Sequence, residues 1–304
     1  MITFVYAVLV FLVLRFSVTL FNFLSNPKLG YYGKHFTDKV SIIISLSDVN
    51  DDPTLLITSI NAQDYADVEI IVKRYEETLE VATAKAIGSF ILFLDVNALI
   101  SKGLINNLIC RAKVFNLDQL SIIPTRSFNS FISRLVYPLS DFVLLNLLPL
   151  RLVRLTRKQI FAATNTGCML FKASSYIKNE DEGSIGQLKA EVLLANKFIC
   201  IDEKVSFDKI SSQLLVSLGN NILAVFIYLL LVIAGPVVVL ANFEPVFLVL
   251  PVGLIFLSRI MISFLTAQNP FVNVLLHPFQ MIMLLLLLLK GLWIKVLTSV
   301  RHKL

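Results

Sequence analysis

Two apolar ends constrain this chain more than any other feature. Residues 2–24 form an almost unbroken apolar run, long enough to cross a bilayer as a helix. Three further apolar stretches follow in the last third of the chain, at 222–240, at 246–265, and from 271 or 276 to 289. The composition agrees, because 56% of the 304 residues are hydrophobic and only 16% are charged. We therefore expect an N-terminal transmembrane anchor (1–24), a globular domain (25–218) and a C-terminal transmembrane region with a basic tail (219–304).

Charges beside the first apolar run predict its orientation. No small-residue cleavage site follows the run, so we expect a retained anchor rather than a signal peptide. Lys28, Lys34 and Lys39 come next, whereas the N-terminal flank carries no charged side chain. The positive-inside rule then places the globular domain in the cytoplasm. Arg15 interrupts the anchor, and we expect it to snorkel toward lipid head groups or to pair with another helix.

The C-terminal tail gives a conflicting indication. Three full spans after a cytoplasmic domain would leave the tail outside. The basic residues of the tail, Lys290, Lys295, Arg301 and Lys303, instead favour the inside. One apolar stretch could resolve the conflict by lying in the interface or re-entering, and the segment around His277-Pro278 is the candidate. The number of C-terminal spans stays open on this pattern.

Between the apolar ends, short apolar strands alternate with helices. Strands are expected at 40–46, 68–72, 90–94 and 120–123, and helices at 53–62, 76–87 and 102–113. This alternation is typical of a doubly wound, mostly parallel α/β sheet. Further along, a loop at 162–171 is expected to enter another strand, and a short helix at 188–197 carries Glu191.

The segment 128–158 stands apart within this domain. It is apolar up to residue 153 but contains charged residues and two prolines, which makes it a poor transmembrane span. An interfacial helix lying in the membrane plane and a plain buried helix pair both fit the pattern. Its basic end, Arg151, Arg154, Arg157 and Lys158, indicates anionic lipid head groups rather than nucleic acid as a partner.

The third predicted strand ends in the candidate site residues. Five apolar residues run into Asp95, and Asn97 follows two positions later, so that both side chains point the same way from an extended tip. A carboxylate and an amide there could hold a divalent cation and, through it, a phosphate. The alternative is that both residues only turn the chain. The three cysteines are far apart in sequence, without metal or redox spacing.

Several short motifs occur in an order that resembles a known family. They are Gln63-Asp64-Tyr65, Glu69-Ile70-Ile71-Val72, the stretch from Gly88 to Asp95, Lys102-Gly103-Leu104, Asn165 to Tyr176, and His277-Pro278. Together they resemble the membrane-bound family 2 glycosyltransferases of the GT-A fold. The similarity is closest to the bacterial subgroup that acts on lipid-like acceptors such as carotenoids and hopanoids, and it covers nearly the whole chain.

The resemblance implies an activity and a set of site residues. It implies inverting transfer of a sugar from a nucleotide-sugar donor to a lipid-like acceptor, with Mg²⁺ or Mn²⁺, at the cytoplasmic face of a bacterial inner membrane. Asp48, Asp95 and Asn97 would contact the donor, and Asp95 would also bind the metal. Glu191 stands where the family has its general base. Membrane lipids are the expected surroundings, and no nucleic acid partner is expected.

The same resemblance shows departures from the family pattern. Asp48-Val49 replaces an Asn-Glu pair, Arg74-Tyr75 replaces an Asp pair that grips the nucleotide, and Asn97 replaces the second metal carboxylate. The segment before Gly88 is shortened, and Ser211-Ser212-Gln213-Leu214-Leu215 replaces a segment with arginine and tryptophan. A second hypothesis is therefore a catalytically inactive relative that binds a lipid or a partner enzyme. A transporter is disfavoured, because Arg259 is nearly the only ionisable residue in the terminal spans.

Overall fold

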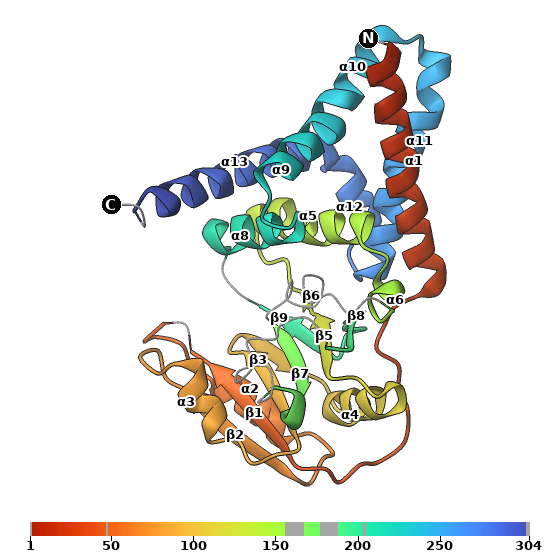
Figure 1. Ribbon diagram of the computed structural model, residues 1–304. Coiled ribbons are helices and arrows are strands. Elements are labelled where there is room, and N and C mark those ends of the chain that lie inside the picture. The colour runs from red at the N-terminus through yellow and green to blue at the C-terminus, as the bar shows by residue number, and fades with distance from the viewer. Residues whose placement is uncertain (1, 47, 156–166, 177–187, 203–204, 302–304) are drawn as a thin grey trace. The chain divides into compact units, whose positions relative to one another are not determined.

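The computed structural model describes residues 2–46, 48–155, 167–176, 188–202 and 205–301 (Figure 1). The chain divides into two compact units. The unit that we call the α/β unit consists of Pro27–Ser127 and Leu150–Glu203. The unit that we call the membrane unit consists of Met1–Asn26, Phe128–Pro149 and Lys204–Leu304. Residues 128–149, which we had placed in the globular domain, thus pack with the apolar helices.

The α/β unit contains a six-stranded sheet and a small three-stranded sheet. Its strands are β1 (Val40–Ser45), β2 (Val68–Lys73), β3 (Phe90–Asp95), β4 (Ala98–Ile100), β5 (Gln119–Ile123), β6 (Thr125–Arg126), β7 (Cys168–Lys172), β8 (Ala190–Leu194) and β9 (Ile199–Ile201). Its helices are α2 (Thr54–Asn61), α3 (Leu79–Ala84), α4 (Leu104–Phe115) and α6 (Leu150–Val153). The order in the large sheet is β2-β1-β3-β7-β5-β8, and in the small sheet β4-β9-β6.

The large sheet is mostly parallel, as the alternating pattern predicts. β1 pairs in parallel with both β2 and β3, and β5 pairs in parallel with β8. β7 is antiparallel to its two neighbours, β3 and β5. The chain leaves β1 to form β2 on one side and then crosses back to form β3 on the other. This reversal makes a topological switch point between β1 and β3, where open α/β sheets bind ligands at the carboxyl ends of their strands.

Apolar side chains cover both faces of the large sheet. One face is packed against α4 through residues such as Leu92, Leu120 and Leu108. The other face carries Ile91 and Phe93 and packs against Ala82 of α3. Burial on both faces explains the apolar runs Ile42–Ile44 of β1 and Phe90–Leu94 of β3, each of which ends in a polar residue at the carboxyl end of the strand.

The predicted helix at 188–197 is wrong. Residues Ala190–Leu194 form β8, fully buried and paired with β5 over five residues. Leu188 to Lys197 contains residues that suit either state, and the hydrogen bonds offered by β5 decide for a strand. This change matters for the site, because a strand places Glu191 inside the sheet.

The membrane unit is entirely helical in its described part. Its helices are α1 (Ile2–Ser25), α5 (Phe131–Leu147), α8 (Phe207–Ser217), α9 (Ile222–Leu229), the π-helical turn η2 (Leu230–Ala234), α10 (Gly235–Asn242), α11 (Pro245–Leu265), α12 (Pro270–Leu275) and α13 (His277–Arg301). Four helical segments are long and apolar enough to cross a membrane: 2–25, 222–242, 245–265 and 277–297. The expected N-terminal helix and C-terminal apolar helices are thereby confirmed.

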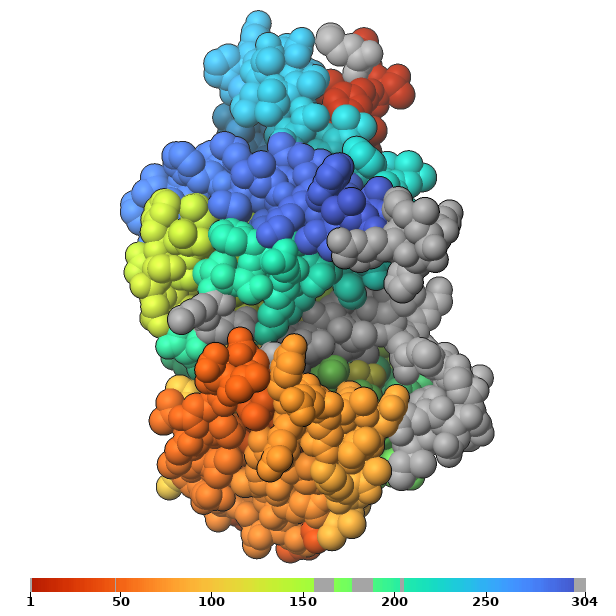
Figure 2. Space-filling view, turned by 90° about the vertical axis from the view of Figure 1, so that its left-hand side faces the viewer, coloured from red at the N-terminus to blue at the C-terminus, as the bar shows by residue number. Residues whose placement is uncertain are grey.

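One of these four segments runs in a different direction from the other three. In Figure 1, α1, α10 and α11 run up and down the view, whereas α13 runs across it together with α5 and α8. Figure 2 shows the blue surface of α13 directly beside the green surface of α8, and both helices share one apolar core with α5. We call α5, α8 and α13 the crosswise layer. The predicted in-plane segment at 128–153 lies largely in this layer.

Side chains from neighbouring helices satisfy the backbone where prolines and helix ends interrupt it. Pro138 lies inside α5 and has no N–H to donate to the carbonyl of Arg134. The amide of Gln280 in α13 donates to that carbonyl at 2.9 Å. Asn22 of α1 donates to the carbonyls of Leu145 and Leu148 at the C-terminal end of α5, at 2.9 and 2.8 Å.

Candidate functional site

Polar residues gather at the carboxyl ends of β2, β1 and β3 in the α/β unit. The pairing register places Lys73, Ser45 and Asp95 side by side on these three strands. Asp48 follows β1 by three residues, and Asn97 follows β3 by two. The structure thus brings Asp48, Asp95 and Asn97 to one edge of the sheet, at the switch point between β1 and β3. We call these residues, with Lys73 and Arg74, the switch-point edge.

Asp95 and Asn97 form a local turn at the tip of β3. The Oδ1 atom of Asp95 accepts hydrogen bonds from the backbone N–H of Asn97 at 3.0 Å and from its side-chain amide at 3.2 Å. The backbone N–H of Asp95 donates to Gly167 at the entrance to β7. This geometry is the chain turn that the sequence left open, and it holds the carboxylate at the strand tip.

Asp48 organises the loop after β1 in a similar way. Its Oδ1 accepts from the backbone N–H of Asn50 at 3.2 Å, and its own backbone N–H donates to Asp51 at 2.9 Å. Asp52 then accepts from Thr54 at the start of α2, and these hydrogen bonds lower the pKa of Asp52. Asp48 and Asp52 therefore shape an exposed, acidic loop beside Asp95.

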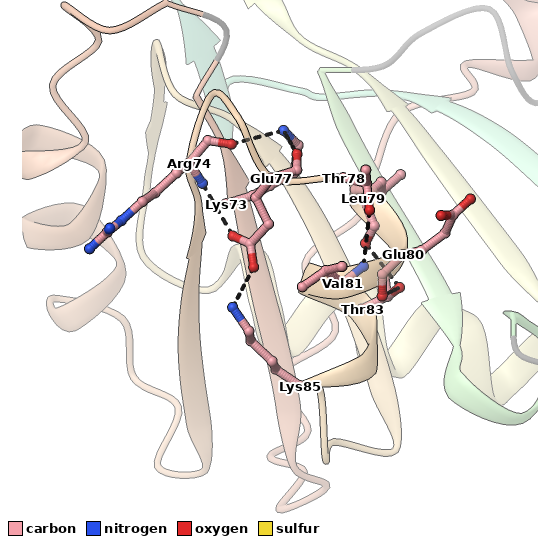
Figure 3. A network of polar contacts seen from close by, with 9 residues as sticks. All are labelled: Lys73, Arg74, Glu77, Thr78, Leu79, Glu80, Val81, Thr83 and Lys85. Atoms are coloured by element: carbon pink, nitrogen blue, oxygen red, sulfur yellow. Dashed lines mark hydrogen bonds and ion pairs between the residues drawn. The ribbon is translucent and has the colours of Figure 1, made fainter.

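The turn after β2 carries Arg74 and Tyr75, at the position where the sequence resemblance implies an Asp pair. Lys73 Nζ donates to the carbonyls of Arg74 and Glu77, and the Glu77 carboxylate accepts from the backbone of Arg74 and from Lys85 (Figure 3). The hydrogen bond from Lys85 chiefly lowers the pKa of Glu77. Figure 3 shows the Arg74 guanidinium extending away from this network. These hydrogen bonds join residues of the turn to one another and to Lys85, and the Arg74 side chain is exposed at the edge of the turn.

Glu191 does not join the switch-point edge. The register aligns Leu92, Leu170, Leu120 and Glu191 in one row across the sheet, so Glu191 lies three strands from β3 and three residues below the level of Asp95. Strand spacing makes this on the order of 14 Å across and 10 Å along the sheet. Because side chains alternate, Glu191 faces the α4 side while Asp95 shares the side of Ile91 and Phe93.

Glu191 lies instead in a buried ion pair. Its side chain has no exposed surface, and Arg111 of α4 donates to both of its oxygens, at 2.7 and 2.6 Å. Arg151 and Arg154 lie 3.8 and 3.6 Å from the same carboxylate. The guanidinium groups of Arg111 and Arg154 also stack on the ring of Phe115. A general base has to lie within hydrogen-bond reach of the acceptor hydroxyl, and in this structure the carboxylate is enclosed in the core.

The electrostatics of this cluster fit a structural role. Burial lowers the pKa of Arg111, but the hydrogen bonds and charge of Glu191 outweigh that effect, and the pKa ends above its ordinary value. Burial and the nearby charge of Arg111 lower the pKa of Arg151. The sequence pattern indicates Arg151 and Arg154 as part of a basic cluster but assigns no role to Arg111. Its only signal was an arginine within the apolar helix Leu104–Phe115.

The residues present fit a divalent cation only together with a ligand. Among the described residues, no group of three or more His, Cys, Asp or Glu side chains could hold a metal ion. Mg²⁺, however, is commonly bound by one or two carboxylates together with substrate phosphates. Asp95 supplies one such carboxylate. A cation at this edge would therefore be held by Asp95 and by the diphosphate of a bound nucleotide.

Some residues of the sequence prediction lie outside the described part of the chain. They are Arg157, Lys158 and the first part of the predicted loop, which includes Asn165.

Comparisons with known proteins give remote structural likenesses. No family model matches the chain, and no curated protein matches its sequence. The mannosyltransferase PcManGT from Pyrobaculum calidifontis, solved with GDP-Man and Mn²⁺, is similar at 13% identity and a TM-score of 0.49, over 96% of this chain and 99% of that chain. TarS 1–349 from S. aureus, solved with UDP-GlcNAc, is similar at 12% identity and a TM-score of 0.37, over 74% and 81%.

A third likeness is weaker still. Glucosyl-3-phosphoglycerate synthase from Mycobacterium tuberculosis, solved with Mn²⁺ and UDP, has 8% identity and a TM-score of 0.32, over 58% of this chain and 76% of that chain. All three TM-scores lie below 0.5. The likenesses by themselves therefore decide neither the ligand nor the reaction of this chain.

Proposed function

We propose that this chain is a membrane-bound glycosyltransferase-like protein whose α/β unit binds a nucleotide-sugar at the switch-point edge. The observation that carries the proposal is the position of Asp48, Asp95 and Asn97 where β1 and β3 end. Ligands of open α/β sheets bind at this point because the loops diverge there and leave a crevice. The family resemblance of the sequence supports a nucleotide-sugar as the ligand.

The side chains of the edge have separable roles in this proposal. Asp95 holds Mg²⁺ or Mn²⁺ that arrives with the donor diphosphate, and Asn97 orients Asp95 through its two hydrogen bonds. Asp48 borders the donor from the β1 side. Arg74, which is exposed at the rim, offers a guanidinium to the diphosphate. The acceptor that we propose is lipid-like, in keeping with the apolar helices of the same chain.

Isothermal titration calorimetry tests donor binding. The full chain in detergent is titrated with UDP- and GDP-sugars, with and without Mn²⁺, up to about 1 mM. We expect binding that requires Mn²⁺, disappears in Asp95→Ala and weakens in Arg74→Ala. Lys102→Ala, an exposed residue outside the edge, is the matched control and should bind as the unaltered chain does. A complete lack of heat for every donor would sink the proposal.

A second candidate function is a catalytically inactive relative that binds a lipid or a partner enzyme. The specific observation in its favour is Glu191, the only carboxylate at the family's base position, which is enclosed by Arg111 in the core. The two candidate functions differ in whether the bound donor is turned over. Transfer of a radiolabelled sugar from the donor to extracted membrane lipids supports an active enzyme. Donor binding without transfer or donor hydrolysis supports the inactive relative.

A further inference from the structure

A partly open cavity in the membrane unit has an unusual charge environment. It has a volume of about 430 Å³, within the range of small-molecule sites. Its walls are apolar side chains of α1, η2, α10, α11 and α13, among them Leu12, Val239, Val252 and Leu285. Only a few polar groups reach it, chiefly Arg15 and His277.

The polar groups lie at one end of the cavity. Arg15 is the most C-terminal cavity residue of α1, Ser258 is the most C-terminal one of α11, and His277 begins α13. Figure 1 shows α1 and α11 both running down toward the crosswise layer. Asn146 of α5 lines the same end. The cavity therefore has a polar floor at the crosswise layer and an apolar shaft between the spans, about 10–15 Å long by helix rise.

Arg15 lacks the partner that a buried guanidinium requires. It is 7% exposed, and its Nε is buried with no hydrogen-bond partner. The guanidinium lies over aromatic rings, at 5.0 Å from the centroid of Phe142 and at 5.7 to 5.8 Å from those of Tyr228 and Phe11. No carboxylate among the described residues forms an ion pair with it. Aromatic faces attract the cation but cannot accept its in-plane N–H groups, so an acceptor is still missing.

Neighbouring groups increase the need for an anion. Arg259 of α11 stacks on the same Phe142 ring at 4.6 Å, which brings a second cation close to the first. Arg259 finds acceptors in Gln280 and Pro138 and lies within electrostatic range of Asp141, but Arg15 shares none of these. His277 Nδ1 and the Tyr228 hydroxyl are likewise buried without a partner. Such unpaired groups are costly in an apolar interior unless a ligand completes them.

We propose that this cavity binds an anionic single-chain lipid, with its acidic head group on Arg15 and its chain in the apolar shaft. Charge complementarity selects an anion, and the apolar walls select a hydrocarbon chain over a free ion. Arg15 and His277 supply donors to the head group, and Asn146 and Ser258 border it. The inference concerns the membrane unit alone and does not depend on whether the α/β unit binds a nucleotide-sugar.

Native mass spectrometry of the delipidated full chain tests the proposal. The probes are oleoyl lysophosphatidic acid, oleoyl lysophosphatidylcholine and inorganic phosphate. We expect one molecule of lysophosphatidic acid bound per chain, preferred over lysophosphatidylcholine by about tenfold, since charge-assisted hydrogen bonds are worth at least that much. Inorganic phosphate alone should not bind. Equal binding of the two lipids, or binding of phosphate alone, overturns the proposal.

Two matched pairs of variants locate the site. Arg15→Gln should reduce lysophosphatidic acid binding to the level of lysophosphatidylcholine. Lys290→Gln, which removes a surface cation paired with Asp208, should have no effect. Val252→Trp fills the shaft and should block both lipids, whereas Leu257→Trp on the outward face of the same helix should not. Unchanged binding in Arg15→Gln, or in Val252→Trp, contradicts the proposed site. If one variant does not fold, the other still decides.

Discussion

At the scale of single residues, Glu191 shows how its surroundings determine what a carboxylate can do. The family resemblance proposes a general base at this position, and only the fold reveals that Arg111 binds both carboxylate oxygens in the core. Three arginines approach one acid, so the cluster carries an excess of positive charge. We infer that Glu191 mainly stabilises the packing of α4 and α6 on the sheet.

Removing the charge of Glu191 should destabilise the protein strongly. Glu191→Gln leaves Arg111 without its counter-charge in the core, at a cost of about 3 kcal/mol. Thermal unfolding of the full chain in detergent measures the effect. Asp38→Asn breaks the partly exposed pair with Lys113 and should cost less than about 1 kcal/mol.

A double replacement checks that the cost arises from the unpaired charge. In Arg111→Met with Glu191→Leu, both charges leave together, and the loss should be smaller than in Glu191→Gln alone. If Glu191→Gln unfolds at the same temperature as Asp38→Asn, the buried pair does not have the role that we infer.

At the scale of elements, side chains from one helix complete the backbone of another. Gln280 of α13 is fully buried and makes contacts in three directions. It donates to the carbonyl that Pro138 leaves unpaired in α5, it accepts from Arg259 of α11, and it contacts Asn273 of α12. The carbonyl that Pro138 leaves unpaired in α5 therefore depends on α13 for its hydrogen bond.

Gln280→Leu should weaken the packing of these helices. The substitution keeps the side-chain volume but leaves the Arg134 carbonyl and one nitrogen of the Arg259 guanidinium without their partner, each at about 1–3 kcal/mol. Gln213→Leu on α8, a half-buried glutamine, is the matched control and should change stability little. Hydrogen exchange of the backbone amides of α5 measures the effect at this helix. Equal protection of these amides in the two variants would contradict the stabilising role of Gln280.

At the scale of the whole molecule, the crosswise direction of α13 bears on the side of the membrane on which the basic tail lies. Of the four segments long enough to span a membrane, α13 packs with α5 and α8 rather than along α1. We propose three crossings, by α1, by the helix from 222 to 242, and by α11. With α13 in the plane of the membrane, its lysines stay on the side of the α/β unit, as the positive-inside rule requires.

Cysteine labelling distinguishes three crossings from four. Single cysteines are placed at Asn50, at Glu244 between α10 and α11, and at Lys295 in α13, in a chain without its native cysteines. With three crossings, a membrane-impermeant maleimide applied to spheroplasts should label Glu244→Cys and spare both Asn50→Cys and Lys295→Cys. Labelling of Lys295→Cys together with Glu244→Cys would show that α13 crosses the membrane.

The sequence by itself determined much of the architecture. Continuous apolar runs predicted the terminal helices and the buried strands, because burial in lipid or on both faces of a sheet demands them. The tip of β3, with Asp95 and Asn97, was placed correctly at a strand end for the same reason.

Only the tertiary structure decided the features that depend on partners distant in sequence. Pairing with β5 made residues 190–194 a strand and enclosed Glu191, and packing on α5 and α8 turned an apolar helix across the others. Arg15 was expected to snorkel or to pair with another helix, and only the fold shows that the rings of Phe142 in α5 and Tyr228 in α9 contact it beside a cavity. The local sequence determines which residues become buried. Long-range packing determines which side chains come into contact, and the chemistry of this protein depends on those contacts.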